Sequence, residues 1–295
     1  MRKQVFAAVL ACAALAVAAA PAAAETSLAS PPKGANNWSC KPSAAHPDPV
    51  VLVHGLGATM GENWAYLSPL LAKRGYCVFA LTYGMDPRFP YFVGGVIPIE
   101  QSAPELNSFV DRVLTATGAS KVDLVGHSEG TFMPEYWLKY LGGATKVAKY
   151  VALAPLYKGT TLYGLASLAN NGEKYGLSQP ILNLISNFCG SCDEFLAGSP
   201  MVQKLQANGG PEVPGIQYTT IMSKYDEAVI PYTSGMLPPP ADNIVIQDVC
   251  KTDLDEHGLQ AFDPAVAQMI FNALDPATAQ PVKCGALPPF GPPPS

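Results

Sequence analysis

Residues 126–130 read Gly-His-Ser-Glu-Gly, a G-x-S-x-G motif whose residue types and spacing could support nucleophilic catalysis. The motif follows the apolar run 122–125, which is typical of a buried strand, and precedes residues 131–141, whose aromatic side chains recur at helical spacing. A serine on a tight turn between a strand and a helix projects its hydroxyl clear of the backbone, and the flanking positions of that turn need glycine. The motif therefore predicts a nucleophile elbow with Ser128 as the nucleophile.

A serine hydroxyl is a poor nucleophile at neutral pH, so it needs a histidine to accept its proton. The chain has four histidines. His46 precedes the first predicted strand, and His54 lies in the loop at the end of that strand. His127 adjoins Ser128, and neighbouring side chains in an extended turn point apart. His257, in a loop between the last predicted strand and the last predicted helix, is therefore predicted to be the base.

A carboxylate must fix the tautomer of that histidine, and with this kind of elbow it lies between the serine and the histidine in the chain. Asp226 directly follows the predicted strand 217–222. It would stand at the carboxyl end of that strand, where functional side chains collect in parallel sheets. We predict Asp226 as the acid, with Glu227 as the alternative.

The oxyanion of an acyl-transfer intermediate needs preorganised N–H donors, one from the residue after the nucleophile and one from the loop after an early strand. The backbone N–H groups of Glu129 and Leu56 occupy these positions. A carboxylate at Glu129 would oppose the developing charge, so its side chain is expected to point away and to engage another part of the helix or loop. Cys189 and Cys192 lack the second cysteine pair or the spaced histidines of a zinc site, so no metal is predicted.

Short β-branched runs alternate with helical patterns along most of the chain. Strands are expected at 49–53, 76–81, 122–125, 150–154, 217–222 and 243–249, and helices at 63–74, 102–117, 131–141 and 263–274. Such alternation predicts an α/β fold with a mostly parallel central sheet and helices on both faces.

One connection, about 156–214, is far longer than ordinary loops. It is predicted to form an inserted, cap-like segment over the carboxyl ends of the strands, where ligands bind in such sheets. Its apolar side chains could line an acyl pocket, although packing onto the body of the domain is the more frequent role for each of them. These side chains are Leu162, Tyr163, Leu165, Leu168, Ile181, Leu182, Leu184, Ile185, Phe188 and Phe195.

Residues 1–24 have a basic start, an alanine-rich apolar run and a small-residue exit, the pattern of a secretory signal peptide. We predict cleavage near Ala24 and secretion, which leaves a domain at 25–285 and a proline-rich tail at 286–295. No stable membrane anchor is predicted. The net charge of −5 at pH 7 becomes more negative once Arg2 and Lys3 are removed, so nothing marks a nucleic-acid partner.

Of the seven cysteines, Cys12 lies in the predicted signal peptide, and the even number that remains implies disulfides in an exported chain. Many pairings are possible, and sequence order favours three of them. They are Cys40 with Cys77, Cys189 with Cys192, and Cys250 with Cys284.

These motifs together resemble the secreted bacterial lipases of the α/β-hydrolase fold, specifically the class 2 lipase group found in actinobacteria and related to small Bacillus lipases. The resemblance rests on residues 51–57 (Val-Leu-Val-His-Gly-Leu-Gly), 123–130, 225–227 and 256–258, and it covers about 36–285. It implies hydrolysis of triacylglycerols or short esters without a cofactor. It also places the triad on Ser128, Asp226 and His257.

The leading hypothesis is therefore a carboxylic ester hydrolase that acts on lipid or other esters through an acyl-enzyme on Ser128. A polyester hydrolase or an acyltransferase would share the whole triad and differ in the pocket. A noncatalytic binding module of the same fold would not need to retain the serine, aspartate, histidine and both oxyanion loops. We expect a monomer with transient contact to a lipid interface.

Overall fold

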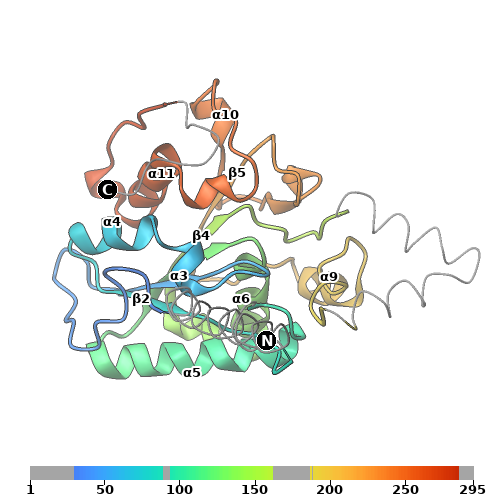
Figure 1. The fold of residues 1–295 in the computed structure, drawn as a ribbon, viewed down its shortest axis with the longest axis horizontal. Coiled ribbons are helices and arrows are strands. Elements are labelled where there is room, and N and C mark those ends of the chain that lie inside the picture. Colours follow the sequence, from blue (N-terminus) through green and yellow to red (C-terminus); the bar gives the residue numbers. More distant parts are fainter. Residues whose placement is uncertain (1–29, 89–93, 162–186, 188, 286–295) are drawn as a thin grey trace, which may run out of the picture.

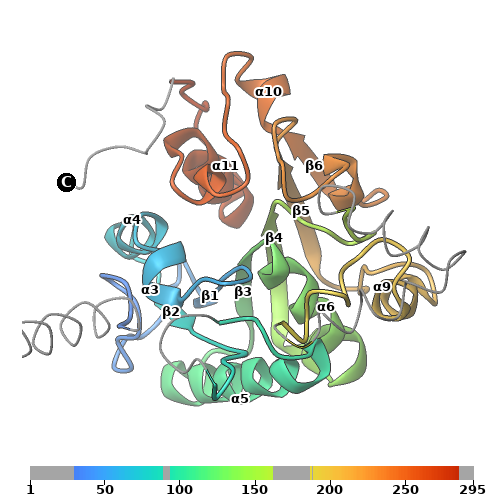
Figure 2. The same ribbon diagram turned by 45° about the vertical axis from the view of Figure 1, so that its right-hand side comes forward.

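The computed structural model describes residues 30–88, 94–161, 187 and 189–285. Its centre is a six-stranded sheet in the order β2-β1-β3-β4-β5-β6, and every pair of neighbours is parallel (Figures 1 and 2). The strands are β1 (Val50–Val53), β2 (Val78–Leu81), β3 (Val122–His127), β4 (Val147–Leu153), β5 (Gln217–Met222) and β6 (Asp242–Val245). The prediction of an α/β fold with a mostly parallel sheet is confirmed.

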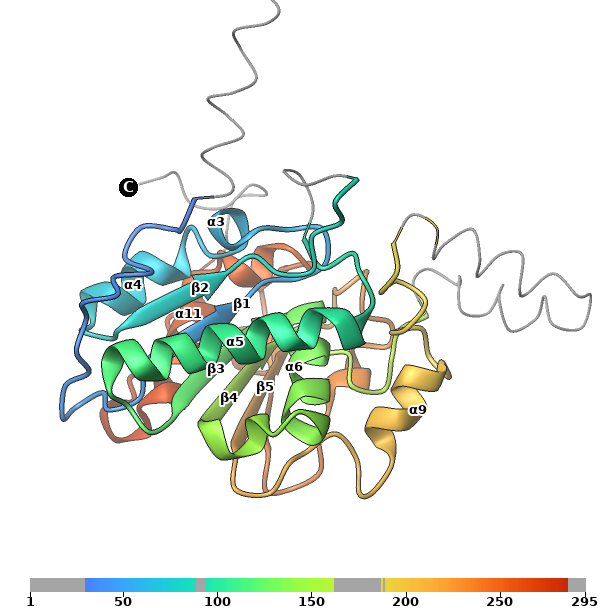
Figure 3. The same cartoon turned by 90° about the horizontal axis from the view of Figure 1, so that it is seen from below.

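Helices cover both faces of the sheet, as Figure 3 shows. Helices α5 and α6 share one hydrophobic core with one face, and α4 and α11 share a second core with the other. Because side chains alternate along a strand, Val51 of β1 enters the first core and Leu52 enters the second. The helices are α3 (Met60–Asn63), α4 (Leu67–Lys73), α5 (Ile99–Thr117), α6 (Glu129–Tyr140), α9 (Pro200–Gln206), α10 (Ile246–Val249) and α11 (Pro264–Leu274), with short 3₁₀ helices at Gly143–Lys146, Tyr232–Gly235, Leu259–Ala261 and Pro276–Thr278.

Local sequence explains where the longest helices begin and end. Helix α5 ends at Gly118, whose φ of 78° is the left-handed conformation that glycine adopts without strain and whose N–H bonds to the Leu114 carbonyl. Helix α11 begins after Asp263, whose side chain accepts the Val266 N–H, and Pro264 occupies its first turn. These caps explain why the predictions for 102–117 and 263–274 lie close to the observed bounds.

Two predicted elements differ from the structure. The single helix predicted at 63–74 is two helices, α3 and α4, and the break leaves Asn63 and Trp64 buried with the Asn63 amide oxygen bonded to the Gly55 N–H. The strand predicted at 243–249 ends at Val245 and continues as α10, which turns the Gln247 amide inward to the Lys224 N–H. In both places tertiary contacts override the local pattern.

The three predicted disulfides are present. Cys40 bonds to Cys77 and ties the N-terminal segment to the start of β2. Cys189 bonds to Cys192 within a short turn, and Cys250 bonds to Cys284 beyond α11.

Replacement of Cys250 and Cys284 by alanine is expected to lower the free energy of unfolding by about 4 kcal/mol on the chain-entropy model, since this bond closes a span of 34 residues. Removal of the Cys189–Cys192 bond, whose span is 3 residues, is expected to cost roughly half as much. Denaturant unfolding of the two double variants measures the difference. Equal losses would contradict the entropic account.

The two described ends of the insert pair with each other. Thr160 forms a bridge to Leu196, and backbone hydrogen bonds run from the Thr160 N–H to the Phe195 carbonyl and from the Ala197 N–H to the Thr160 carbonyl. Phe195 packs edge-on against Phe132 of α6, at a ring-centroid distance of 6.4 Å, so it belongs to the core of the body.

The other apolar side chains proposed for an acyl pocket, from Leu162 to Phe188, lie outside the described residues. So do the predicted signal peptide at 1–24 and the tail at 286–295, which remain predictions. Among the helices of the described ranges, none combines the length and the apolar character that a membrane span requires.

Candidate active site

Ser128 stands on the turn between β3 and α6, with φ 55° and ψ −123°. A positive φ is unfavourable for a residue with a side chain and is typical of strained functional turns. The flanking glycines allow the turn to close: a Cβ on Gly126 would lie 2.0 Å from the Gly130 carbonyl oxygen, and one on Gly130 would lie 2.2 Å from the Val53 carbonyl oxygen. The structure therefore has the tight strand-to-helix turn that the motif predicts.

The structure brings the three predicted catalytic side chains into one hydrogen-bonded chain. Ser128 Oγ lies 2.8 Å from His257 Nε2. On the other edge of the ring, His257 Nδ1 lies 2.9 Å from Asp226 Oδ2 and 3.0 Å from Asp226 Oδ1. Ser128 and His257 are partly exposed, whereas Asp226 is buried. A substrate can therefore approach the serine while the carboxylate stays away from water.

The surroundings of Asp226 favour its charged form. Burial raises the pKa of this carboxyl, but hydrogen bonds from His257 and from the backbone N–H groups of Val229 and Ala228 outweigh burial, so the pKa lies below its usual value. The Gln260 amide also donates to Asp226 Oδ2 at 3.1 Å. Asp226 is thus held as a carboxylate in a fixed orientation, as the partner of a histidine must be.

Glu227, the alternative acid, makes a different contact. Its Oε2 accepts the backbone N–H of His257 at 3.0 Å. The ring of His257 is hydrogen-bonded to Asp226. Glu227 therefore holds the main chain of the histidine, while Asp226 holds its ring.

The loop that carries His257 also contains buried carboxyl groups. Asp253, Asp255 and Asp263 are almost inaccessible, and one oxygen from each lies within 4.8 Å of the others, close enough to hold a cation. Burial, followed by the charges of Asp263, Asp253 and Glu256, raises the pKa of Asp255 to about 8. The prediction that the chain has no metal site stays a prediction.

The other three histidines lie where they cannot exchange a proton with Ser128. His46 stacks on Tyr76 at a ring-centroid distance of 3.8 Å. His54 is fully buried directly after β1, where its Nε2 accepts the Tyr83 N–H, and burial lowers its pKa to about 4. His127 points away from Ser128 toward Asn63 and the carbonyl of His257.

Leu56, the first predicted oxyanion donor, follows β1. The N–H groups of its two neighbours are occupied: Gly55 donates to Asn63 Oδ1 at 3.0 Å, and Gly57 donates to the Gly94 carbonyl at 2.9 Å. Within the described part of the chain, the Leu56 N–H donates to no acceptor. The loop thus presents one backbone donor beside the elbow, where a Cβ on Gly55 would lie 3.0 Å from Ser128 Cβ.

Glu129, the second predicted donor, begins α6, and its N–H likewise has no acceptor among the residues that the structure describes. Its side chain packs on another loop, where a Cβ on Gly95 would lie 2.5 Å from Glu129 Oε2, and both carboxyl oxygens are buried with no hydrogen-bond partner in the described ranges. Burial and the nearby Glu194 raise the pKa of Glu129 well above its usual value. Because this favours the neutral acid, the side chain does not repel a developing oxyanion.

Sequence reasoning missed two contacts of this site. Asn63 Oδ1 accepts the Gly55 N–H in the loop after β1 and lies 3.0 Å from His127 Nδ1, and the Gln260 amide donates to the predicted acid. Neither residue belongs to a motif, so only the tertiary structure identifies them.

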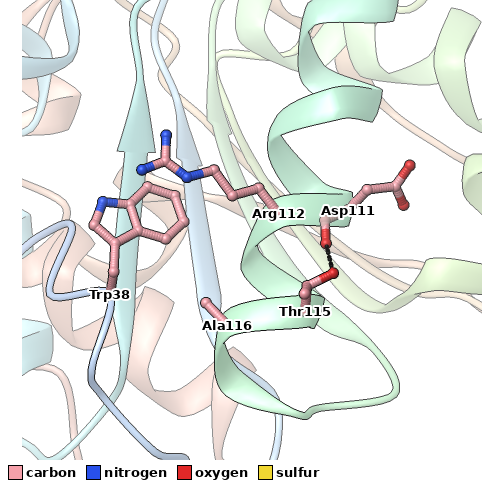
Figure 4. Close-up of a pocket in the computed structure, with 5 residues that line it drawn as sticks. All are labelled: Trp38, Asp111, Arg112, Thr115 and Ala116. Atoms are coloured by element: carbon pink, nitrogen blue, oxygen red, sulfur yellow. Dashed lines mark hydrogen bonds between the residues drawn. The ribbon is translucent and has the colours of Figure 1, made fainter.

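A surface hollow on α5 lies apart from this site (Figure 4). In it, the Arg112 guanidinium stacks over the Trp38 ring at 3.7 Å, and the Thr115 hydroxyl donates to the Asp111 carbonyl at 2.8 Å. Apart from Trp38, which lies in the segment before β1, these residues lie near the end of α5, which leads into the beginning of β3, whereas Ser128 follows the end of β3. The hollow is therefore at the amino end of the sheet and the candidate site is at its carboxyl end.

Comparison with known proteins bears on the fold and the family of the chain. Among solved structures, the chain is similar to Aspergillus fumigatus lipase B, with a TM-score of 0.60 and 17% identity over 82% of this chain and 56% of that one. It is also similar to the mature form of Bacillus licheniformis lipase BlEst2, with a TM-score of 0.50 and 16% identity over 74% of this chain and 87% of that one. At these identities the likeness concerns the fold, and the chain spans only about half the length of the Aspergillus lipase.

A family model described as lipase (class 2) matches residues 47–269. Since that match covers most of the chain, the protein belongs to the class 2 lipase family.

Proposed function

We propose that this protein is an exported carboxylic ester hydrolase that cleaves acylglycerols or other lipid esters through an acyl-enzyme on Ser128. The observation that carries the proposal is the continuous chain of hydrogen bonds from Ser128 through His257 to Asp226, placed on a nucleophile elbow. A fold alone would not justify an activity, because many functions share it. The arrangement of these three side chains is typical of acyl transfer.

The proposed reaction uses each of these contacts in turn. Ser128 Oγ attacks the ester carbonyl while His257 Nε2, at 2.8 Å, accepts the hydroxyl proton. Asp226 stabilises the resulting imidazolium through Nδ1. His257 then donates the proton to the departing alcohol, which leaves an acyl-enzyme. A water molecule activated by the same histidine releases the carboxylic acid and restores the serine.

The oxyanion of each tetrahedral intermediate is proposed to accept hydrogen bonds from the N–H groups of Leu56 and Glu129. Both groups lack an acceptor among the described residues: Leu56 lies in the loop after β1, and Glu129 is the first residue of α6, directly after Ser128. Removing one such donor typically lowers kcat by about 10²–10³. Because these donors are backbone groups, the identity of the two side chains matters little to the chemistry.

Export is proposed from two features. Residues 1–24 have the pattern of a signal peptide, and three disulfides tie the described domain. Disulfides persist mainly in oxidising compartments outside the cytosol.

The function is tested by labelling with a fluorophosphonate, which reacts with an activated serine, and by a series of p-nitrophenyl esters and triacylglycerol emulsions of increasing acyl length. We expect stoichiometric labelling of Ser128, hydrolysis of the esters, and neither result in Ser128→Ala. An inert wild-type protein that is correctly folded would instead indicate a binding module. Labelling with transfer of the acyl group to an added alcohol in preference to water would indicate an acyltransferase.

A further inference from the structure

His127, the variable residue of the elbow motif, lies between two oxygen atoms. It is 6% exposed. Its Nε2 lies 3.0 Å from the backbone carbonyl oxygen of His257, and its Nδ1 lies 3.0 Å from Asn63 Oδ1. The rings of His127 and His257 are 5.0 Å apart between centroids. The histidine that cannot act as the base therefore contacts the main chain of the histidine that can.

One proton must be assigned between these two contacts. Burial, reinforced by the nearby His257 ring, lowers the pKa of His127 to about 3, so the imidazole is neutral near pH 7 and carries a single N–H. Asn63 Oδ1 already accepts the Gly55 N–H at 3.0 Å. In the described part of the chain, His127 is the only donor within reach of the His257 carbonyl. A neutral ring leaves one of the two contacts without a proton. With the proton on Nε2, Asn63 Oδ1 still has the Gly55 N–H as a donor, whereas with the proton on Nδ1 the His257 carbonyl would have none.

We propose that His127 is a positioning residue whose Nε2–H donates to the backbone carbonyl of His257 and holds that histidine at hydrogen-bond distance from Ser128. The inference rests on the proposed function, because it takes His257 as the general base. It adds a role for the residue between the glycine and the serine of the motif, which the triad itself does not use.

The main chain of His257 needs such support because of where it lies. The residue stands between α10 and the short 3₁₀ helix at Leu259–Ala261, outside any strand or helix. Its N–H is held by Glu227, which follows β5, and its carbonyl is held by His127, at the end of β3. These two contacts lie on either side of the Cα atom. Together they restrict both translation of the loop and rotation of the peptide planes that aim the ring.

The contact also couples the base to the nucleophile. His127 and Ser128 are adjacent, so a shift of the elbow moves the carbonyl anchor of His257 together with the serine hydroxyl. Misplacement of a catalytic group by about 1 Å can lower a rate about 10²-fold. An anchor that moves with the nucleophile keeps the 2.8 Å contact between Ser128 and His257 constant.

Two substitutions distinguish the roles of the two ring nitrogens of His127. In His127→Gln the amide nitrogen reaches about as far as Nε2, so it can still donate to the His257 carbonyl. In His127→Asn the amide nitrogen reaches only as far as Nδ1, so it can contact Asn63 but not His257. We expect His127→Asn and His127→Ala to lower kcat about 10- to 100-fold with little change in KM, and His127→Gln to retain most of kcat.

The rates are measured on a soluble p-nitrophenyl ester, with the melting temperature of each variant recorded beside them. His46→Ala is the control, because it removes a partly exposed imidazole that packs on Tyr76, away from Ser128, and it should leave kcat unchanged. Wild-type kcat in both the Asn and Ala variants would overturn the proposal. The proposal would also be overturned if His127→Asn retained kcat and His127→Gln lost it, because that result would put the proton on Nδ1. If all three variants lost kcat to the same extent and also had equally lowered melting temperatures, the ring would only fill space and the proposal would be wrong.

The same experiment distinguishes this failure from failure of the proposed function. If Ser128→Ala remains active, the acyl-enzyme mechanism is wrong. If Ser128→Ala is inactive while His127→Asn and His127→Ala match the wild type, the mechanism stands and only the role of His127 is wrong.

Discussion

Replacement of Ser128 or of His257 by alanine is expected to lower kcat for ester hydrolysis by about three or more decades, because the two residues act in one proton-transfer unit. The contact of 2.8 Å between Ser128 Oγ and His257 Nε2 is the physical basis of this expectation. Combining both substitutions should lower kcat hardly further, since either one alone removes the unit. The measurement is kcat on a soluble ester for the two single variants and the double variant.

Both variants should fold, because neither side chain contributes to the two hydrophobic cores. Unchanged melting temperatures would show that the loss is chemical. A His257→Ala variant that kept more than about a tenth of the wild-type rate would require another base, and the buried positions of His54 and His127 offer none.

Asp226→Asn is expected to lower kcat by about three to four decades, because an amide no longer favours the tautomer of His257 that accepts a proton from Ser128. The variant also loses the carboxylate charge that stabilises the imidazolium. Its neighbour provides a matched control. In Glu227→Gln the side-chain oxygen still accepts the His257 N–H, which is 3.0 Å away in the wild type, so most of the activity should remain.

The opposite pattern, with an active Asp226→Asn and an inactive Glu227→Gln, would move the acid role to Glu227. Activity at several pH values makes the comparison sharper. The pKa of Asp226 is held below its usual value by its hydrogen bonds. Any loss of activity caused by protonation of this carboxylate should therefore occur at a lower pH than the pKa of a free aspartic acid.

Much of the candidate site could be predicted because the signals are local or ordered along the chain. The elbow motif places its serine and both of its glycines within five residues. Because a predicted strand leads directly into these residues, few other interpretations of the segment remain. Asp226 and His257 followed from chain order and from the scarcity of histidines. Strand β5 was predicted with its observed bounds, and it is the strand that delivers Asp226.

The remainder depends on contacts between distant segments. Asn63 is 64 residues from His127 in sequence, and Gln260 is 34 residues from Asp226. No periodicity or motif marks such pairs. The buried, neutral character of Glu129 likewise arises from packing against Gly95, and a sequence pattern cannot report the environment of a carboxyl group.

The hydrogen bonds that join the two described ends of the insert affect how the length and sequence of this segment can change. Because Thr160 pairs with Leu196, the ends of that segment are already joined where it leaves the body. Lengthening the chain between them adds little closure entropy, about 0.6 kcal/mol for each doubling of loop length. The stretch can therefore be exchanged as a cassette, by evolution or by design, without shifting the register of β4 against β5. The triad, which lies on other segments, would be unchanged by such an exchange.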